Sequence, residues 1–588
     1  MGPSKFSYQK LALAVMLASG VLAGCSDSDG INKTTPVAPP EAKAIVNPVT
    51  LIFQGIDSGI LTNQQINFTL AGSEKDYLFV LGATKNADGS YDLTPGSGTV
   101  MISRGDNAAV EDFSLDLHAT SPGYFATGMS ILIPAQKQAV TGKEGASYEI
   151  IFTPLAPDAN TTAGVTAKQA TAKAPNGVLQ EALELVTDVA ADNAPNKATV
   201  GKSIVDLTVP ANTRMTDDQG NPVEGNITAN IVYFSNEPEG AIANESVLDA
   251  FPGGLSPSTV LGEDGNPNDE YDEITFVSAG FTAIQIQNDK GDIVSNFDRP
   301  VPLTFNVAKE TLDLEGNPIT KGGTIPLWSY NEKTGQWKSE GVAKIEDVNP
   351  DGTFKVTQNI KHLSYYNLDY YGRRCRANIT FKEANGNDYN PRVIFTRNGG
   401  GWNRSIYISG MDTHTFYNIP DGSQGELKVV SRSDYTAGLI KSISKNGAAL
   451  TLTADKTYEG NFCDLDGATI EIESPSTKTL NVSLQSKCND TGETKAQPGV
   501  VYVYGKNYHG YYGAVTPTAV TPGTMRLEEG DYLLSGRIYT EKYGSQVDTK
   551  NIIISDNSDV TLTFPIDKCG TTTTGTTGTT GASGGSGA

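Results

Sequence analysis

The sequence predicts an all-β protein built from tandem β-sandwich domains in a row, with one short helix in a linker. Two observations predict this class. The chain has 588 residues, which is too long for one hydrophobic core and favours three to five domains. It also contains many short runs with the period-2 alternation of a half-buried strand, as in Phe113 to His118, separated by turns rich in Gly, Asn and Asp.

The chain is strongly acidic. It holds 67 Asp and Glu residues against 44 Lys and Arg residues, which gives a net charge of -23. A surface that binds phosphates needs clustered basic side chains, so the composition argues against nucleic acid as a partner. The same charge repels anionic lipid headgroups, so we expect membrane attachment to come from a lipid anchor.

The first 24 residues have the order of a signal peptide. Lys5 and Lys10 precede an apolar run over 11–22, and Ala23-Gly24 follow just before Cys25. The run has about 12 residues, whereas a transmembrane helix needs roughly 20. Residues 22–25 resemble the bacterial lipobox, which implies cleavage before Cys25 and lipidation of that cysteine.

The lipobox resemblance also implies a membrane partner and a location. In lipoproteins an aspartate after the cysteine retains the protein at the inner membrane, so Ser26 implies the outer membrane. The cell surface and the periplasmic face are both compatible with this leader, and we expect the cell surface. Residues 25–45 are polar and contain several prolines, so we expect a flexible tether there.

Composition then divides the chain into an N-terminal sandwich over 46–160, a linker over 161–198 and a central β-rich module over 199–371. The start of the linker, up to Lys173, is rich in Ala, Thr and Lys and poor in large apolar residues. Further along, apolar residues recur at helical spacing, and this pattern predicts one helix over 178–191. The apolar residues of that helix are Leu179, Leu183, Val186 and Ala190.

The central module resembles β-rich modules of bacterial surface proteins. The resemblance is carried by the segments Val209 to Thr213, Phe251 to Leu255, Ile325 to Tyr330 with Trp337, and His362 to Asn367. In those proteins, such a module lies just before Ig-like or transthyretin-type sandwiches. The resemblance implies architecture and no particular activity.

Two further units, over 372–466 and 467–569, look alike. Each contains a strand, an Asp-Gly or Glu-Gly turn and a second strand, and this signature resembles the carboxypeptidase-regulatory-like (transthyretin-type) sandwich. The remaining residues, 570–588, are only Gly, Thr, Ser and Ala. They have no apolar surface to bury, so we expect a disordered tail.

Four cysteines remain after Cys25, and in an exported chain an even number suggests disulfides. Four cysteines allow three pairings. Because each of the two C-terminal units holds two of them, the pairing that we favour joins Cys375 with Cys463 and Cys488 with Cys569.

The densest aromatic segment surrounds the turn at residues 505–507. Flat rings beside amide donors suit stacking on sugars or capture of a peptide, and Trp402 is the corresponding candidate in the preceding unit. The alternative is that the rings pack on one another. The candidate ligand-binding residues of this segment are Tyr504, Tyr508, His509, Tyr511 and Tyr512.

An acidic run makes Asp264, Asp269 and Asp272 candidate ligands for Ca²⁺, because carboxylate oxygens at short spacing suit a hard cation. The run lacks the glycine at loop position six and the acid at position twelve of a calcium loop, so a solvated acidic loop is the favoured alternative. We expect no other cofactor.

The sequence contains no convincing catalytic motif. Residues 581–585 match G-x-S-x-G but lie in the expected tail, and no H-E-x-x-H occurs. We therefore expect a non-catalytic envelope protein that binds a glycan, matrix or protein partner. The alternatives are a polysaccharide-acting enzyme with an unrecognised site and a structural spacer in an envelope assembly.

Overall fold

The computed structural model describes most of the chain between residues 34 and 573. Among the described residues the strands dominate and the only helices are five short 3-10 turns, so the expected all-β class is confirmed. None of these helices is long and apolar enough to cross a membrane. Cys25 and the leader lie outside the described residues. The described ranges are 34–43, 48–56, 58–105, 108–133, 146–157, 164–187, 205–236, 247–257, 259–271, 273–331, 334–350, 352–386, 389–408, 410–432, 436–505, 510–569 and 571–573.

The first unit is a sandwich of two sheets. One sheet has the order β10-β9-β4-β7-β6, and the other has the order β11-β2-β8-β5, with β3 beside β2. In β9 the side chains of Leu115 and Leu117 are buried between the sheets, as the alternation predicted. The elements are β2 (Val49–Gly55), β3 (Gly59–Ile60), β4 (Asn67–Ala71), η1 (Lys75–Tyr77), β5 (Leu78–Leu81), β6 (Ala83–Lys85), β7 (Tyr91–Leu93), β8 (Thr99–Arg104), β9 (Phe113–Thr120), β10 (Thr127–Ile133) and β11 (Ala146–Phe152).

The central unit follows the strand order β12-β16-β18-β23-β20-β21-β22-β19-β14-β13 around an apolar core. The predicted hairpin with two tryptophans is formed by β20 and β21, where Tyr330 pairs with Trp337. The elements are β12 (Val165–Ala174), η2 (Pro175–Gly177), β13 (Leu183–Val186), β14 (Val205–Val209), β15 (Met215–Thr216), β16 (Gly225–Phe234), η3 (Val247–Ala250), β17 (Val260–Leu261), η4 (Asp269–Tyr271), β18 (Ile274–Asn288), β19 (Asn296–Val307), β20 (Thr324–Asn331), β21 (Gln336–Val348), β22 (Phe354–His362) and β23 (Tyr365–Glu383).

The linker and helix expected before this unit are wrong. Residues 165–174 form β12, an edge strand paired along its whole length with β16. Residues 183–186 form β13, in which Leu183 and Leu185 are buried and Glu184 is exposed. Leu183 and Leu185 therefore follow the two-residue spacing of a strand, although Leu179 and Leu183 also fit the spacing of a helix. The strand forms because it pairs with β14. The rest of the expected helix, from residue 188, lies outside the described residues.

The third and fourth units share one topology, as their similar sequences suggested. In the third, β23 pairs antiparallel with β26 and parallel with β31, and in the fourth β32 does the same with β36 and β39. The opposing sheets are β25-β24-β27-β30 and β35-β34-β37-β38. The elements are β24 (Arg392–Arg397), β25 (Asn403–Tyr407), β26 (Thr413–Pro420), β27 (Gln424–Val430), β28 (Ile440–Lys445), β29 (Ala448–Leu450), β30 (Tyr458–Asn461), η5 (Phe462–Leu465), β31 (Ala468–Ile472), β32 (Lys478–Cys488), β33 (Thr494–Gln497), β34 (Val500–Gly505), β35 (Gly510–Val515), β36 (Gly523–Leu527), β37 (Gly530–Thr540), β38 (Gly544–Ile554) and β39 (Ser558–Ile566).

Each of these two units contains one disulfide, in the pairing that the sequence favoured. Cys375 is joined to Cys463 and Cys488 to Cys569, with Cα–Cα distances of 6.0 and 5.7 Å. The first bridge precedes the paired parts of β23 and β31, and the second joins Cys488, the last paired residue of β32, to Cys569 just after β39. Each bridge therefore secures a parallel pair whose strands are far apart in sequence.

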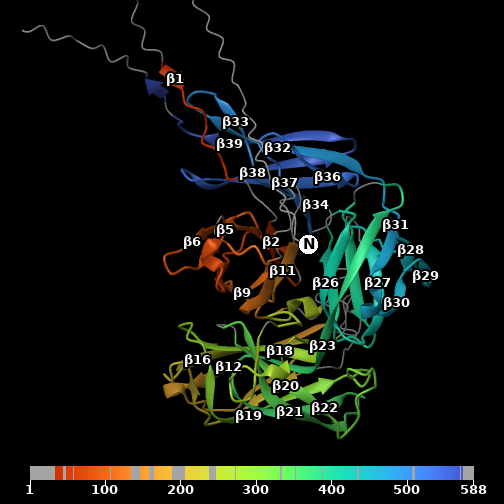
Figure 1. Cartoon of the computed structure of the whole chain (residues 1–588). Coiled ribbons are helices and arrows are strands. Elements are labelled where there is room, and N and C mark those ends of the chain that lie inside the picture. Colours follow the sequence, from red (N-terminus) through yellow and green to blue (C-terminus); the bar gives the residue numbers. More distant parts are fainter. Residues whose placement is uncertain are drawn as a thin grey trace, which may run out of the picture.

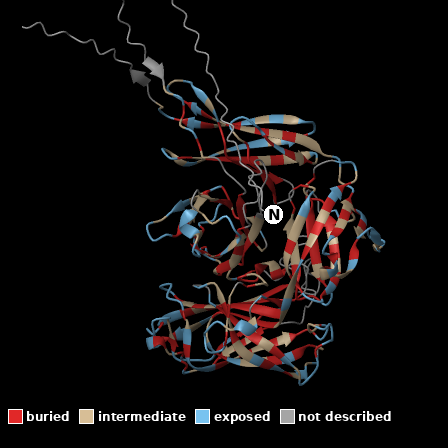
Figure 2. Ribbon diagram, in the orientation of Figure 1, coloured by how far each residue is buried: buried red, intermediate tan, exposed pale blue. Residues whose placement is uncertain are grey.

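The four units do not form a simple row. The first sandwich lies among the other three (Figure 1), and each unit has its own buried interior (Figure 2). The first sandwich contacts the last one directly, because the hydroxyls of Thr99 and Tyr504 lie 2.7 Å apart and Arg537 donates to Thr99. It contacts the central unit through Phe125 and Ile151, which enter the aromatic core of that unit.

The first and last described segments of the chain pair with each other. Residues 34–36 form β1 (Thr34–Pro36), which pairs with β40 (Thr571–Thr573). Gln497 then donates to the carbonyl oxygen of Pro40 at 2.7 Å and accepts from the backbone of Ala42 at 2.8 Å, and Ala42 is buried. Residues 34–43 of the expected tether and residues 571–573 of the expected tail therefore contact other parts of the protein. Residues 574–588 lie outside the described residues.

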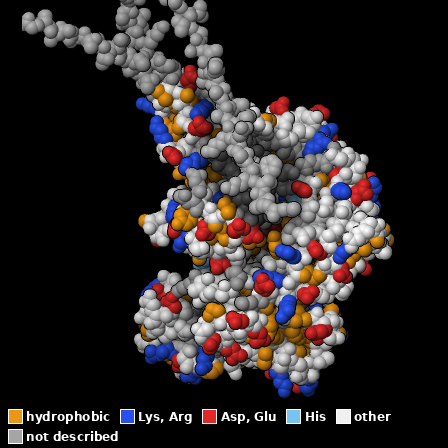
Figure 3. Space-filling model, in the orientation of Figure 1, with side chains coloured by type: hydrophobic (Ala, Val, Ile, Leu, Met, Phe, Trp, Pro, Cys, Tyr) orange, Lys and Arg blue, Asp and Glu red, His pale blue; other side chains and the backbone are white. Residues whose placement is uncertain are grey.

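The exposed surface carries both signs of charge. On the face in Figure 3, acidic and basic side chains are interspersed over all the units that it shows. The excess of acid is therefore spread out, with no field of one sign on this face.

Removal of the first disulfide tests its contribution to stability. Replacing both Cys375 and Cys463 with Ser should lower the free energy of unfolding by about 4 to 5 kcal/mol, because the bridge closes a loop with a sequence separation of 88. The measurement is urea denaturation, and wild-type protein with reductant is the control. Equal midpoints for variant and wild type would contradict the expectation, and a Cys375 to Cys488 link in a non-reducing peptide map would refute the pairing.

A buried carboxyl group in β23 gives the protein a pH dependence. Asp369 is fully buried, and neither carboxyl oxygen has a hydrogen-bond partner among the described residues. Burial raises the pKa of this carboxyl group well above its usual range, so the folded protein holds the proton to a higher pH than the unfolded chain does. The unfolded chain releases that proton at about pH 4, so this group costs stability as the pH rises above that value.

The replacement Asp369→Asn should therefore raise the melting temperature at pH 7 more than at pH 4.5, because the amide has no proton to hold. Thermal unfolding at both pH values measures the difference. Asp292→Asn, in an exposed turn, serves as the control. The same shift at both pH values would show that Asp369 is ionised in the folded protein.

Candidate functional site

The tyrosine segment expected to form an exposed recognition surface is buried. Tyr504 is 9 % exposed, Tyr511 4 % and Tyr512 2 %, so their rings are not available for stacking on a ligand. Tyr504 and Tyr511 pack with Ile52 and Met101 of the first sandwich. The alternative interpretation, that the rings pack on one another and on a neighbour, is the one that the structure supports. Tyr508 and His509 lie outside the described residues.

Replacement of Tyr504 and Tyr511 with Ala should consequently destabilise the protein. Each change removes a large aromatic side chain from a packed interface, and such losses cost about 3–5 kcal/mol in a core. Differential scanning calorimetry measures the effect, with the half-exposed Tyr77→Ala as the control. A double variant that melts like the wild type would mean that the two sandwiches do not depend on this contact.

Trp402 and the acidic run are the other two candidates from the sequence. Trp402 is buried, and its ring packs 5.9 Å from that of Phe462. Asp264 accepts hydrogen bonds from the backbone and side chain of Asn266, so its carboxylate stabilises its own turn. Asp269 lies in η4, and Asp272 lies outside the described residues. Among the described residues, three metal-ligating side chains converge only at Cys488, Cys569 and Asp490, where the two sulfurs are joined in a disulfide.

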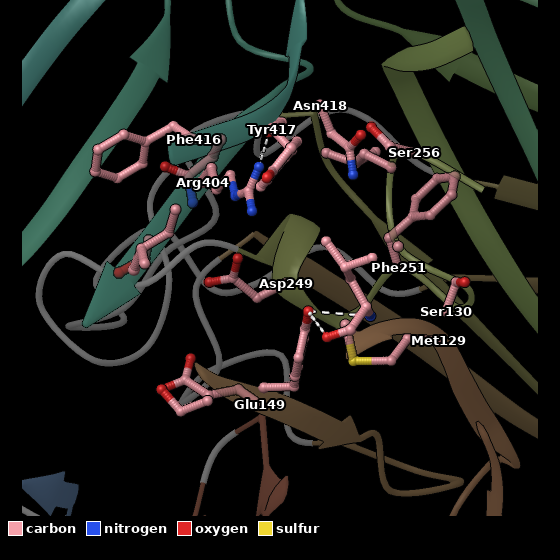
Figure 4. Close-up of a pocket in the computed structure, with 18 of the residues that line it drawn as sticks. Met129, Ser130, Glu149, Asp249, Phe251, Ser256, Arg404, Phe416, Tyr417 and Asn418 are labelled. Atoms are coloured by element: carbon pink, nitrogen blue, oxygen red, sulfur yellow. Dashed lines mark hydrogen bonds between the residues drawn. The ribbon is translucent and has the colours of Figure 1, made fainter. Parts of the chain in front are cut away.

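A cavity lies where the first, central and third units meet. Its volume is about 530 Å³, within the range of sites for small molecules. The first unit contributes β10 and β11, the central unit contributes η3 and the loop that follows it, and the third contributes β25 and β26. Figure 4 shows these three walls around one space.

Two glycines allow the first and central walls to meet. The backbone of Gly253 donates to the carbonyl oxygen of Gly128, and a bridge joins Met129 to Gly253. A Cβ atom at Gly128 would lie 2.3 Å from the carbonyl oxygen of Leu117, and Gly253 has a φ of 74°. A Cβ atom at Gly128 would also lie 2.8 Å from the hydroxyl oxygen of Tyr330 in the central unit. A side chain at this position would therefore strain the contact between the two units, and one at Gly253 would strain its own backbone.

Four charged side chains line the cavity: Asp112 just before β9, Glu149 from β11, Asp249 from η3 and Arg404 from β25. Figure 4 shows Arg404 and Asp249 on opposite walls, with Glu149 beside the first sandwich. Glu149 lies 3.9 Å from the guanidinium of Arg392, whose side chain is completely buried. That distance brings the two opposite charges together at the edge of the cavity.

Arg404 differs from the other charged groups in its partners. Among the described residues, its guanidinium donates to the backbone carbonyl oxygen of Tyr417 and forms no ion pair. Burial lowers the pKa of this guanidinium, and the nearby Tyr148 opposes the effect. An arginine stays charged under all ordinary conditions, so the cavity contains a positive charge that is partly removed from water.

Asn418 at the rim has a left-handed backbone conformation, with a φ of 63°. Asparagine tolerates this conformation better than most residues. It turns the chain within β26 so that Tyr417 and Asn418 both line the cavity.

Sequence reasoning missed this site because its residues come from three units. Glu149 and Arg404 lie 255 positions apart, and no local motif contains them. Two signals were present. The segment Phe251 to Leu255, which carried the resemblance of the central module, supplies part of one wall, and Trp402, a candidate from the sequence, also lines the cavity.

Comparisons with known proteins add little. No family model matches the chain, and no curated protein matches it. Solved structures that align with it include the TIE protein of Bacillus anthracis (11 % identity, TM-score 0.13, 68 % of this chain and 57 % of that one), the major pilin BcpA of Bacillus cereus (10 %, 0.13, 89 % and 99 %) and the pilus adhesin SpaC of Lactobacillus rhamnosus GG (11 %, 0.13, 90 % and 57 %). The chain therefore spans little more than half the length of the first of these. At such TM-scores the likeness carries no argument about function.

Proposed function

We propose that the chain is a non-catalytic lipoprotein of the outer membrane that displays four packed β-sandwich units at the cell surface and binds a ligand between them. The cavity shared by the first, central and third units is the observation that carries the binding role. It combines a volume of about 530 Å³ with both apolar and charged walls, and ligand sites prefer such junctions between domains.

The position of the N-terminal segment supports the anchoring role. Thr34 begins β1, nine positions after Cys25, and nine extended residues span at most about 30 Å. Residues 37–43 then continue along the last sandwich. A lipid on Cys25 would hold that sandwich close to the membrane, and the rest of the protein would extend outward from it.

The two alternative functions differ from this proposal in what they require. A spacer needs an extended row of domains. In this protein the contacts of Thr99 with Tyr504 and Arg537 hold the last sandwich against the first. An enzyme has to turn over its substrate. Incubation of the purified protein with polysaccharide and peptide panels should release no new reducing ends or amines, and reproducible release would replace the binding role with an enzymatic one.

The anchoring role predicts the effect of the replacement Cys25→Ala. The variant should leave the membrane fraction, because acyl chains at ~0.8 kcal/mol for each buried CH₂ supply nearly all of the membrane affinity. Cell fractionation and immunoblotting measure this. The variant Ser26→Asp is a matched control, which should keep the lipid and move the protein to the inner membrane. Recovery of Cys25→Ala in the membrane pellet after a high-salt wash would refute a lipid anchor.

A further inference from the structure

We propose that the cavity binds a saccharide that carries a carboxylate, with Arg404 pairing the carboxylate and Glu149 and Asp249 accepting hydrogen bonds from hydroxyl groups. This inference deepens the proposed binding role and rests on it. It follows from the charge balance of the cavity, from the donors and acceptors on its walls and from its aromatic lining.

Arg404 is the group in the cavity that calls for an anionic partner, because the other charged groups on the walls are carboxylates. Glu149 already faces the guanidinium of Arg392, at 3.9 Å. Arg404, in contrast, has only the carbonyl oxygen of Tyr417 as a hydrogen-bond partner among the described residues. A guanidinium has five N–H donors and matches a carboxylate with two parallel hydrogen bonds. A carboxylate on the ligand would supply the counter-charge that the described part of the protein does not supply.

The opposite wall limits how much negative charge the ligand carries. Asp112, Glu149 and Asp249 all line the cavity, and ionised carboxylates only accept hydrogen bonds. They would repel a ligand with several phosphate or sulfate groups. A ligand with one carboxylate and several O–H donors satisfies both walls, because its donors face the protein carboxylates while its anionic group faces Arg404.

The remaining lining favours a sugar. Ser130, Ser256 and Asn418 add small donors and acceptors around the charged groups. The half-buried Tyr417 adds a ring, which can pack against the apolar face of a pyranose while the polar rim bonds the hydroxyl groups. Uronic acids unite all these features, since each ring carries one carboxylate and several hydroxyl groups.

The test is isothermal titration calorimetry of the full-length protein, purified in detergent, with three probes. Trigalacturonate is the acidic saccharide, maltotriose is the neutral saccharide, and trialanine is a peptide with a free carboxylate. We expect trigalacturonate to bind at least tenfold more tightly than either of the other two. The assay uses purified protein, so its outcome is independent of where the protein resides in the cell.

Two variants assign any binding to the cavity. Arg404→Gln should weaken trigalacturonate binding at least tenfold, and Ser256→Trp, which fills the cavity and leaves Arg404 in place, should abolish it. Arg376→Gln, at an exposed arginine outside the cavity, is the matched control and should bind like the wild type. Thermal unfolding of each variant verifies that it is folded.

Four results would overturn the proposal: no binding of trigalacturonate, equal binding of maltotriose, unchanged binding by folded Arg404→Gln, or tighter binding of trialanine. The last result would identify a peptide site and leave the general binding role intact. A lipid anchor that fails the Cys25 test would change the location of the protein without changing any of these affinities.

Discussion

The buried guanidinium of Arg537 connects the last sandwich to the first. The side chain of Arg537 in the last sandwich is completely buried and donates to the hydroxyl of Thr99 in the first, at 2.8 Å. Its charged group also lies 4.5 Å from the ring centre of Tyr502. A buried charge is tolerated only when it is hydrogen-bonded, so the last sandwich depends on the first to satisfy this arginine. The four units consequently form one closed body.

The cavity depends on how the first sandwich packs against the other units. Its walls come from three units, and the first sandwich touches the central one where Gly128 meets Gly253. Any shift of the first sandwich would move Glu149 relative to Arg404. The shape of this cavity and the distant contact between Thr99 and Arg537 thus both depend on the position of the first sandwich.

Local patterns were sufficient for the elements whose partners lie nearby. The alternation in β9, the pairing of Tyr330 with Trp337 and the likeness of the third and fourth units all follow from short stretches of sequence. The strand β13 was mistaken for a helix because Leu179 and Leu183 also fit helical spacing, and only its pairing with β14 decides between the two. The burial of Tyr504 depends on Thr99, which is 405 positions away, so no local pattern reveals it.

The central claim is that the four sandwiches close around the first one. Small-angle X-ray scattering of the full-length protein tests it most directly, because closure and an open row of domains differ strongly in overall size. A compact body of 588 residues should have a radius of gyration of about 25 Å, with a single maximum in the distance distribution. A much larger radius, with separate maxima from successive domains, would contradict the closed arrangement and with it the cavity.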